Sequence, residues 1–195
     1  MNKDMVVDLV WLTLRNPTAA SERILGLQLG RNILWPGLIL ASALNTIFFS
    51  LGNLLFPAAA APGFFASPLA MFVLLTGVLV LTIHALFWTG KMLGGEGELG
   101  DLLALMVWLQ ALRVLVQIAV IVLLLIAPMM SVLASLIAGV WGIWILLNFI
   151  KVAFRFPSLG KAAGVLLIAT VGLVFGLLFL ASVVGLTSAG GIGSV

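Results

Sequence analysis

Three polar residues in an otherwise apolar stretch are the part of this sequence best suited to chemistry. Gln110, Arg113 and Gln117 are spaced i, i+3, i+7, so an α-helix places all three on one face. Arg113 lies about thirteen residues, and therefore about 20 Å, into the bilayer-length stretch 99–128. A charge near the midplane costs about 2.5–3.5 kcal/mol. An arginine at this depth therefore needs partners.

The polar face is expected to look into a helix bundle, where Arg113 would meet Asn45, His84 or Asn148. No Asp or Glu lies at the same depth as Arg113. Two interpretations stay open. Arg113 either binds an external anion, such as a lipid phosphate or a solute carboxylate, or acts as a structural strut. The hypothetical ligand-binding set is Arg113, Gln110, Gln117, Asn45 and His84.

His84 is the single histidine, and the sequence has no cysteine. This excludes thiol catalysis, iron–sulfur clusters and a multi-histidine metal site within the chain. His84 is either a proton-linked switch or a histidine hydrogen-bonded between helices. Glu96, Glu98 and Asp101 suit the positive dipole at a helix N-terminus. We therefore expect no enzyme activity, no cofactor and no metal.

Composition decides the fold class. The 195 residues are 64% hydrophobic and 8% charged, whereas soluble domains carry roughly 25% charged residues. So much apolar surface requires lipid as the solvent. We predict an all-α, polytopic membrane bundle with five transmembrane helices. The membrane domain covers 33–186, with spans at about 33–56, 69–92, 100–127, 130–150 and 162–186.

Residues 1–32 are predicted to form cytoplasmic or interfacial helices. Residues 3–15 are too short to span, and either lie in the interface with Trp11 at headgroup depth or pack on the other helices. Asn16 and Pro17 predict an N-cap and a first helical position. In the fifth span, Gly172 and Gly176 predict close approach of a neighbouring backbone. Residues 187–195 are predicted to be a flexible tail.

The basic residues predict the orientation. All of them except Arg113 fall in the N-terminal segment, at the loop after span two or in the loop after span four, which is one side of the membrane. The positive-inside rule makes this side cytoplasmic. The N-terminus is then cytoplasmic and the C-terminus lies outside.

Several motifs resemble a known family. They are the proline-led helix LRNPTAASERIL, a G-G-x-G-x-L-x-D start to the third span, and S-L-G-K-A before the fifth. Together with five spans they resemble the Yip (Yip-one) domain family over about residues 9–186. The residues that carry the resemblance are Gly94, Gly95, Leu99, Asp101, Trp144, Ser158, Lys161 and Ala162.

The resemblance implies a location more than an activity. Eukaryotic members are linked to Rab GTPases and vesicle traffic, but this sequence lacks their acidic N-terminal cytosolic segment. It is more similar to the bacterial members, integral inner-membrane proteins of unassigned activity. The expected location is therefore a bacterial cytoplasmic (inner) membrane.

Two functions of different classes are compatible with the sequence. The first is a non-enzymatic protein that organises or adapts other membrane components or lipid. The second is a small transporter or channel with a polar seam around Arg113, although five spans show no internal repeat. The expected partners are membrane lipids, and also other membrane proteins or a second copy. No nucleic-acid partner is expected.

Overall fold

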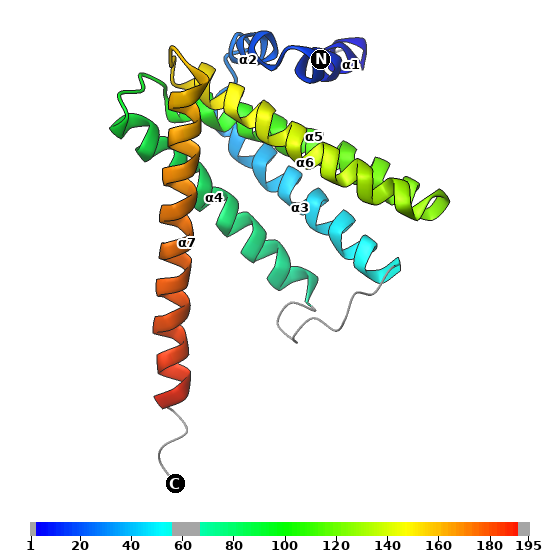
Figure 1. The fold of residues 1–195 in the computed structure, drawn as a ribbon, viewed down its shortest axis with the longest axis vertical. Helices are drawn as coiled ribbons and strands as arrows, with labels where there is room; N and C mark the ends of the chain where they lie inside the picture. The colour runs from blue at the N-terminus through cyan, green and yellow to red at the C-terminus, as the bar shows by residue number, and fades with distance from the viewer. Residues whose placement is uncertain (1–2, 56–66, 191–195) are drawn as a thin grey trace.

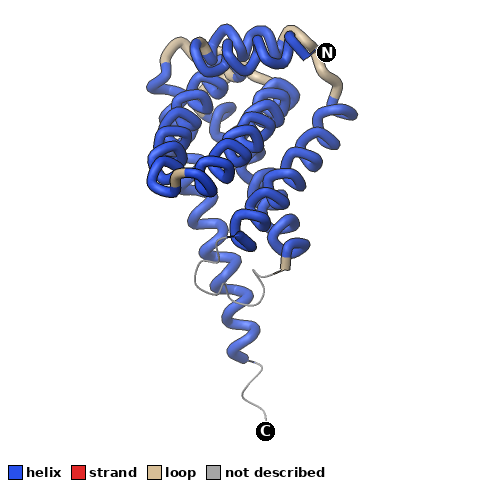
Figure 2. The backbone as a smooth tube through the Cα atoms, turned by 90° about the vertical axis from the view of Figure 1, so that its right-hand side faces the viewer, coloured by secondary structure: helices blue, strands red, loops and turns tan. Residues whose placement is uncertain are grey.

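The fold is entirely helical in the part of the chain that the structure describes. The computed structural model describes residues 3–55 and 67–190, which form helices and no strand. Two short helices lie across one end of the molecule (Figure 1, Figure 2): α1 (Lys3–Arg15) and α2 (Pro17–Leu25). Five long helices extend away from them: α3 (Arg31–Leu55), α4 (Pro68–Met92), α5 (Leu99–Ile126), α6 (Pro128–Ala153) and α7 (Leu159–Gly190).

Each long helix has a stretch long and apolar enough to cross a membrane. The prediction of an all-α bundle with five spans and a short N-terminal helical segment is confirmed. Helix α7 continues through residues 187–190 of the predicted tail. Residues 191–195 of that tail lie outside the described residues, as does most of the predicted loop between the first two spans.

Several helix starts follow from local sequence. At α2, the Asn16 side chain accepts a hydrogen bond of 3.1 Å from the Ala19 amide, and Pro17 is the first helical residue. This confirms the predicted cap. Pro68 and Pro128 begin α4 and α6 in the same position, where a missing N–H costs nothing.

The two ends of the five-helix group differ in charge. Because successive spans alternate in direction, the starts of α3, α5 and α7 meet the ends of α4 and α6 (Figure 1). We call this the charged end. Every Lys, Arg, Asp and Glu of the sequence except Arg113 lies there or in the preceding N-terminal segment. The opposite end, where α3 and α5 finish, is the uncharged end.

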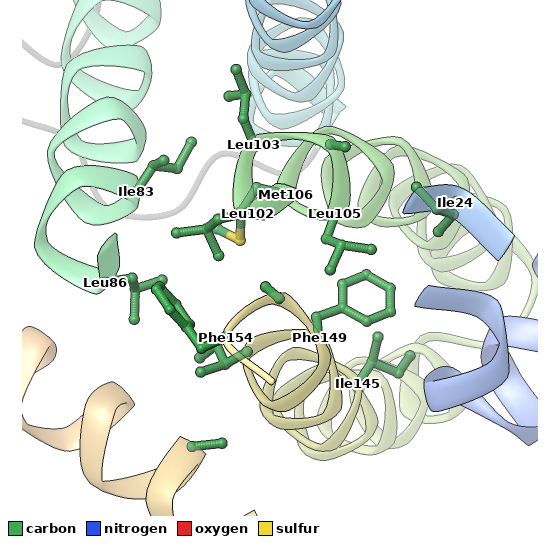
Figure 3. Close-up of a cluster of buried hydrophobic side chains, with 14 of the residues drawn as sticks. Ile24, Ile83, Leu86, Leu102, Leu103, Leu105, Met106, Ile145, Phe149 and Phe154 are labelled. Atoms are coloured by element: carbon green, nitrogen blue, oxygen red, sulfur yellow. The ribbon is translucent and has the colours of Figure 1, made fainter. Parts of the chain in front are cut away.

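The core sits at the charged end (Figure 3). Five consecutive residues of α5, 102–106, are buried, which requires neighbours on every side of the helix. Around them pack Leu86 of α4 and Phe149 of α6, both fully buried. In α7 the buried positions stop at Ala169 among the described residues. Toward the uncharged end α4 and α7 diverge from α5 and α6, as Figure 1 shows.

The N-terminal helices are docked on α5 and α6. The Trp108 indole N–H donates to the Thr13 hydroxyl at 3.0 Å, and the Trp141 indole N–H donates to the Leu14 carbonyl at 3.2 Å. Trp11 is exposed and carries the Arg15 guanidinium over its ring at 5.6 Å. Residues 3–15 pack on the other helices, as one of the two interpretations expects, and the interfacial depth of Trp11 stays a prediction.

Candidate functional site

Arg113 lies on the exposed surface of α5, about halfway along the helix. No hydrogen bond or ion pair joins its guanidinium to another described residue. The expectation that this position looks into the bundle is therefore wrong for Arg113. Leu112 and Val114, which flank Arg113 in the sequence, are buried, so α5 still has packed neighbours here and Arg113 lies on the face of the helix that turns away from them.

The rest of the polar face is brought together with Asn45, as expected. The Asn45 amide donates to the Ala41 carbonyl at 2.8 Å and lies 3.4 Å from the Gln110 side-chain oxygen. It also lies 3.3 Å from the Gln110 backbone carbonyl. This polar contact joins α3 to α5 within the spanning region. There the two side chains bond to each other instead of to water.

Two acceptors on this face have no partner in the described residues. The side-chain oxygens of Asn45 and Gln117 are buried without a hydrogen bond. A buried polar atom without a partner costs about 1–3 kcal/mol. Arg113 lies about one turn before Gln117 on α5, but these two oxygens are buried whereas Arg113 is exposed.

The other two expected partners of Arg113 are bonded elsewhere. The Asn148 amide donates to the Trp144 carbonyl at 2.8 Å, and its oxygen accepts from the Thr18 hydroxyl at 3.0 Å. Asn148 therefore joins α2 to α6 at the charged end. Its role is in docking the N-terminal helices, and it lies too near that end to pair with Arg113.

His84 is half-buried between helices rather than beside Arg113. Its Nδ1 lies 2.8 Å from the Val80 carbonyl one turn earlier in α4. Its ring stacks on Trp35 of α3 with a centroid distance of 6.3 Å. The ring is thus packed between α3 and α4, but its hydrogen bond lies within α4 and does not join two helices. The described residues contain no group of three or more metal-ligating side chains placed to hold an ion.

A groove runs between α4 and α7 in the spanning region. Its volume is about 460 Å³, and its walls are almost wholly apolar. Gly172 and Gly176 line it, and a Cβ added at either would meet nothing within 4 Å. The prediction that these glycines bring a neighbouring backbone close is therefore wrong. The helices diverge here, so the glycines widen a groove rather than tighten a contact.

The close glycine contacts lie at the charged end instead. A Cβ on Gly95 would lie 2.7 Å from the Phe154 ring, and one on Gly90 would overlap the same ring. A Cβ on Gly97 would overlap the Ala153 carbonyl. The Glu96 amide donates to the Phe154 carbonyl at 3.1 Å. The loop between α4 and α5 is thus folded against the end of α6.

Other residues that carried the family resemblance also have structural roles. Gly94 has a φ of +82°, a conformation suited to glycine. The Ser158 hydroxyl accepts from the Lys161 amide at 3.4 Å at the start of α7, and Ala162 is fully buried. Sequence reasoning missed Phe154, whose one signal was its position between a span and a basic loop.

One of the three comparisons with known proteins identifies a family. A family model described as the Yip1 domain matches residues 11–181. Comparison with curated proteins gives no match, and comparison with solved structures gives none either. The matched range includes all five long helices except the end of α7, and it contains the glycine loop and the docked α2. The chain is therefore an integral membrane protein that belongs to the Yip1 domain family.

Proposed function

We propose that this protein is a non-enzymatic organiser or adaptor of membrane components, acting on lipid or on other membrane-spanning helices. The observation that carries the proposal is the divergence of the spans beyond the charged end. It leaves long apolar helix faces exposed, for example Leu54, Leu125 and Phe179. In a bilayer these faces are covered by lipid or by other spans, so a folded chain has surface available for both.

The location and orientation belong to the same proposal. The basic residues at the charged end support a cytoplasmic position for that end, with the C-terminus outside. The similarity to bacterial members supports a bacterial inner membrane. Reporter fusions at the two termini test the orientation: a C-terminal reporter active in the cytoplasm contradicts it.

Co-isolation tests the organising role. The full chain is extracted from its membrane in polymer-bounded lipid discs, without detergent, and the lipids and proteins in the discs are quantified. We expect enrichment of particular lipids or membrane proteins over discs that hold an unrelated five-span protein. A disc composition equal to that of the bulk membrane contradicts the proposal.

The alternative is a small transporter or channel with a seam around Arg113. It is favoured by one observation: a free guanidinium in mid-span lies on the same helix as the unpaired oxygen of Gln117. Flux of labelled anions into vesicles that contain the purified protein tests it. Flux above that of empty vesicles, lost in Arg113→Gln, supports transport. Equal flux in both vesicles removes this alternative.

A further inference from the structure

We propose that the groove between α4 and α7 binds one acyl chain of an anionic phospholipid, whose phosphate lies between Lys91 and Lys161. This inference rests on the proposed function and names the lipid class on which it acts. The groove is lined by Leu81, His84, Ala85, Trp88, Gly172, Leu173, Gly176, Leu177 and Phe179.

The walls of the groove suit a hydrocarbon chain. The α4 wall is one helix face, because Leu81, His84, Ala85 and Trp88 follow i, i+3, i+4, i+7 spacing. Across from it, the two glycines of α7 leave open space where other residues would place side chains. A volume of about 460 Å³ falls within the usual range of ligand pockets, about 300–1,000 Å³.

Two lysines mark the mouth of this groove at the charged end. Lys91 follows Trp88 by three residues, so it continues the groove face of α4, and its side chain is exposed. Lys161 is exposed in the first turn of α7, eleven residues before Gly172, which is close to three full turns. Both lysines therefore lie on the charged-end side of the two helices that form the walls of the groove.

A row of aromatic rings fixes the position of the two lysines. The Lys91 Nζ lies 5.9 Å from the centroid of the Phe87 ring, and the Lys161 Nζ lies 6.0 Å from that of Phe156. Phe154 lies between them, 6.4 Å from Phe87 and 5.6 Å from Phe156 by ring centroids. The two lysines thus lie at the two ends of this row of rings, and both side chains are exposed.

The charges and the depth together select the occupant. Leu81 lies ten residues before Lys91, about 15 Å along the helix, which is half of the roughly 30 Å hydrocarbon core. On α4 the groove thus reaches about one leaflet's depth below its basic mouth, as an acyl chain does beneath a phosphate. Glu96 and Glu98 are exposed in the same loop, and neither forms an ion pair with a lysine in the described residues. A second copy of this chain would present the same lysines.

Photocrosslinking in vesicles tests the inference. The full chain is reconstituted in phosphatidylcholine vesicles with a trace of phosphatidylglycerol that carries a diazirine in one acyl chain, or with the matched phosphatidylcholine probe. Labelled peptides are mapped by mass spectrometry. We expect the phosphatidylglycerol probe to label 81–88 and 173–179 more than the phosphatidylcholine probe, by on the order of tenfold for two lysines.

Two sets of variants separate the charge from the groove. Lys91→Gln with Lys161→Gln should reduce phosphatidylglycerol labelling to the phosphatidylcholine level. Arg15→Gln with Arg23→Gln, the same charge change on α1 and α2, should leave it unchanged. Gly172→Leu with Gly176→Leu fills the groove and should remove most labelling by both probes, whereas Gly139→Leu on the open face of α6 should not.

Two outcomes would overturn the proposal: labelling of the groove no stronger than that of the exposed face of α6, or labelling by both probes that the lysine variants do not change. Labelling of the groove no stronger than that of α6 would mean that the groove holds only bulk lipid. If the groove fails this test while the discs still show enriched components, the site is wrong and the organising role stands. Selective labelling of the groove, together with a disc composition equal to that of the bulk membrane, would mean that the site is right and the organising role is wrong.

Discussion

The charged and uncharged ends use the same residue type in opposite ways. At the charged end Gly90, Gly95 and Gly97 admit Phe154 and the end of α6 into close contact. Toward the uncharged end Gly172 and Gly176 face open space. Glycine in a membrane sequence therefore marks a place where a side chain is absent. Whether a backbone, a ring or a lipid occupies that place depends on how the helices diverge.

The largest expected effect is at Phe154. Phe154→Ala should lower the free energy of unfolding by about 3–5 kcal/mol, because it empties the space that Gly90 and Gly95 leave for the ring. Chemical unfolding of the detergent-solubilised protein measures this change. Phe175→Ala is the matched control, since that ring is 68% exposed. Its effect should stay within about 0.5 kcal/mol. Equal effects of the two variants would abolish the distinction between the ends.

The second test concerns glycine itself. Gly97→Ala should destabilise the protein by about 1–3 kcal/mol, because the new methyl group meets the Ala153 carbonyl of the backbone. Gly176→Ala should be neutral or slightly stabilising, since alanine is the better helix former and the position is open. Thermal unfolding of both variants in one detergent measures the difference. Destabilisation by Gly176→Ala alone would reverse the comparison.

A third, smaller effect concerns the docking of the N-terminal helices at the charged end. Thr18→Val should weaken docking by about 0.5–1.5 kcal/mol, because Asn148 loses the hydroxyl that its oxygen accepts from. Hydrogen–deuterium exchange of the α1 and α2 amides should become faster, whereas Thr18→Ser should keep the bond and the protection. Unchanged exchange in Thr18→Val would mean that apolar packing alone holds these helices.

The smallest expected effect is at Arg113. Arg113→Gln should not lower the free energy of unfolding, because the guanidinium has no partner among the described residues to lose and the substitution removes a charge from mid-span. The same unfolding assay measures it, with Asn45→Leu as a comparison that breaks the contact with Gln110. A clear loss of stability in Arg113→Gln would restore the structural-strut interpretation.

Part of the polar face could be predicted from sequence. Helical spacing placed Gln110 and Gln117 on one face, whereas Asn45, expected as a partner of Arg113, contacts Gln110 instead. The exposure of Arg113 could not be predicted in this way. It depends on which face of α5 the neighbouring helices cover, and apolar residues occur on every side of α5, so no amphipathic pattern marks the uncovered face.

The sequence by itself determined the helices, their number and the separation of charge. In lipid every backbone group must be satisfied within the helix, so apolar length is enough to define a span. Tertiary structure alone decided which glycines are contacts, what α1 and α2 dock against, and that a groove lies between α4 and α7. The physical reason is that lipid and side chains are equally apolar, so helix packing depends on shape, and shape requires the assembled backbone.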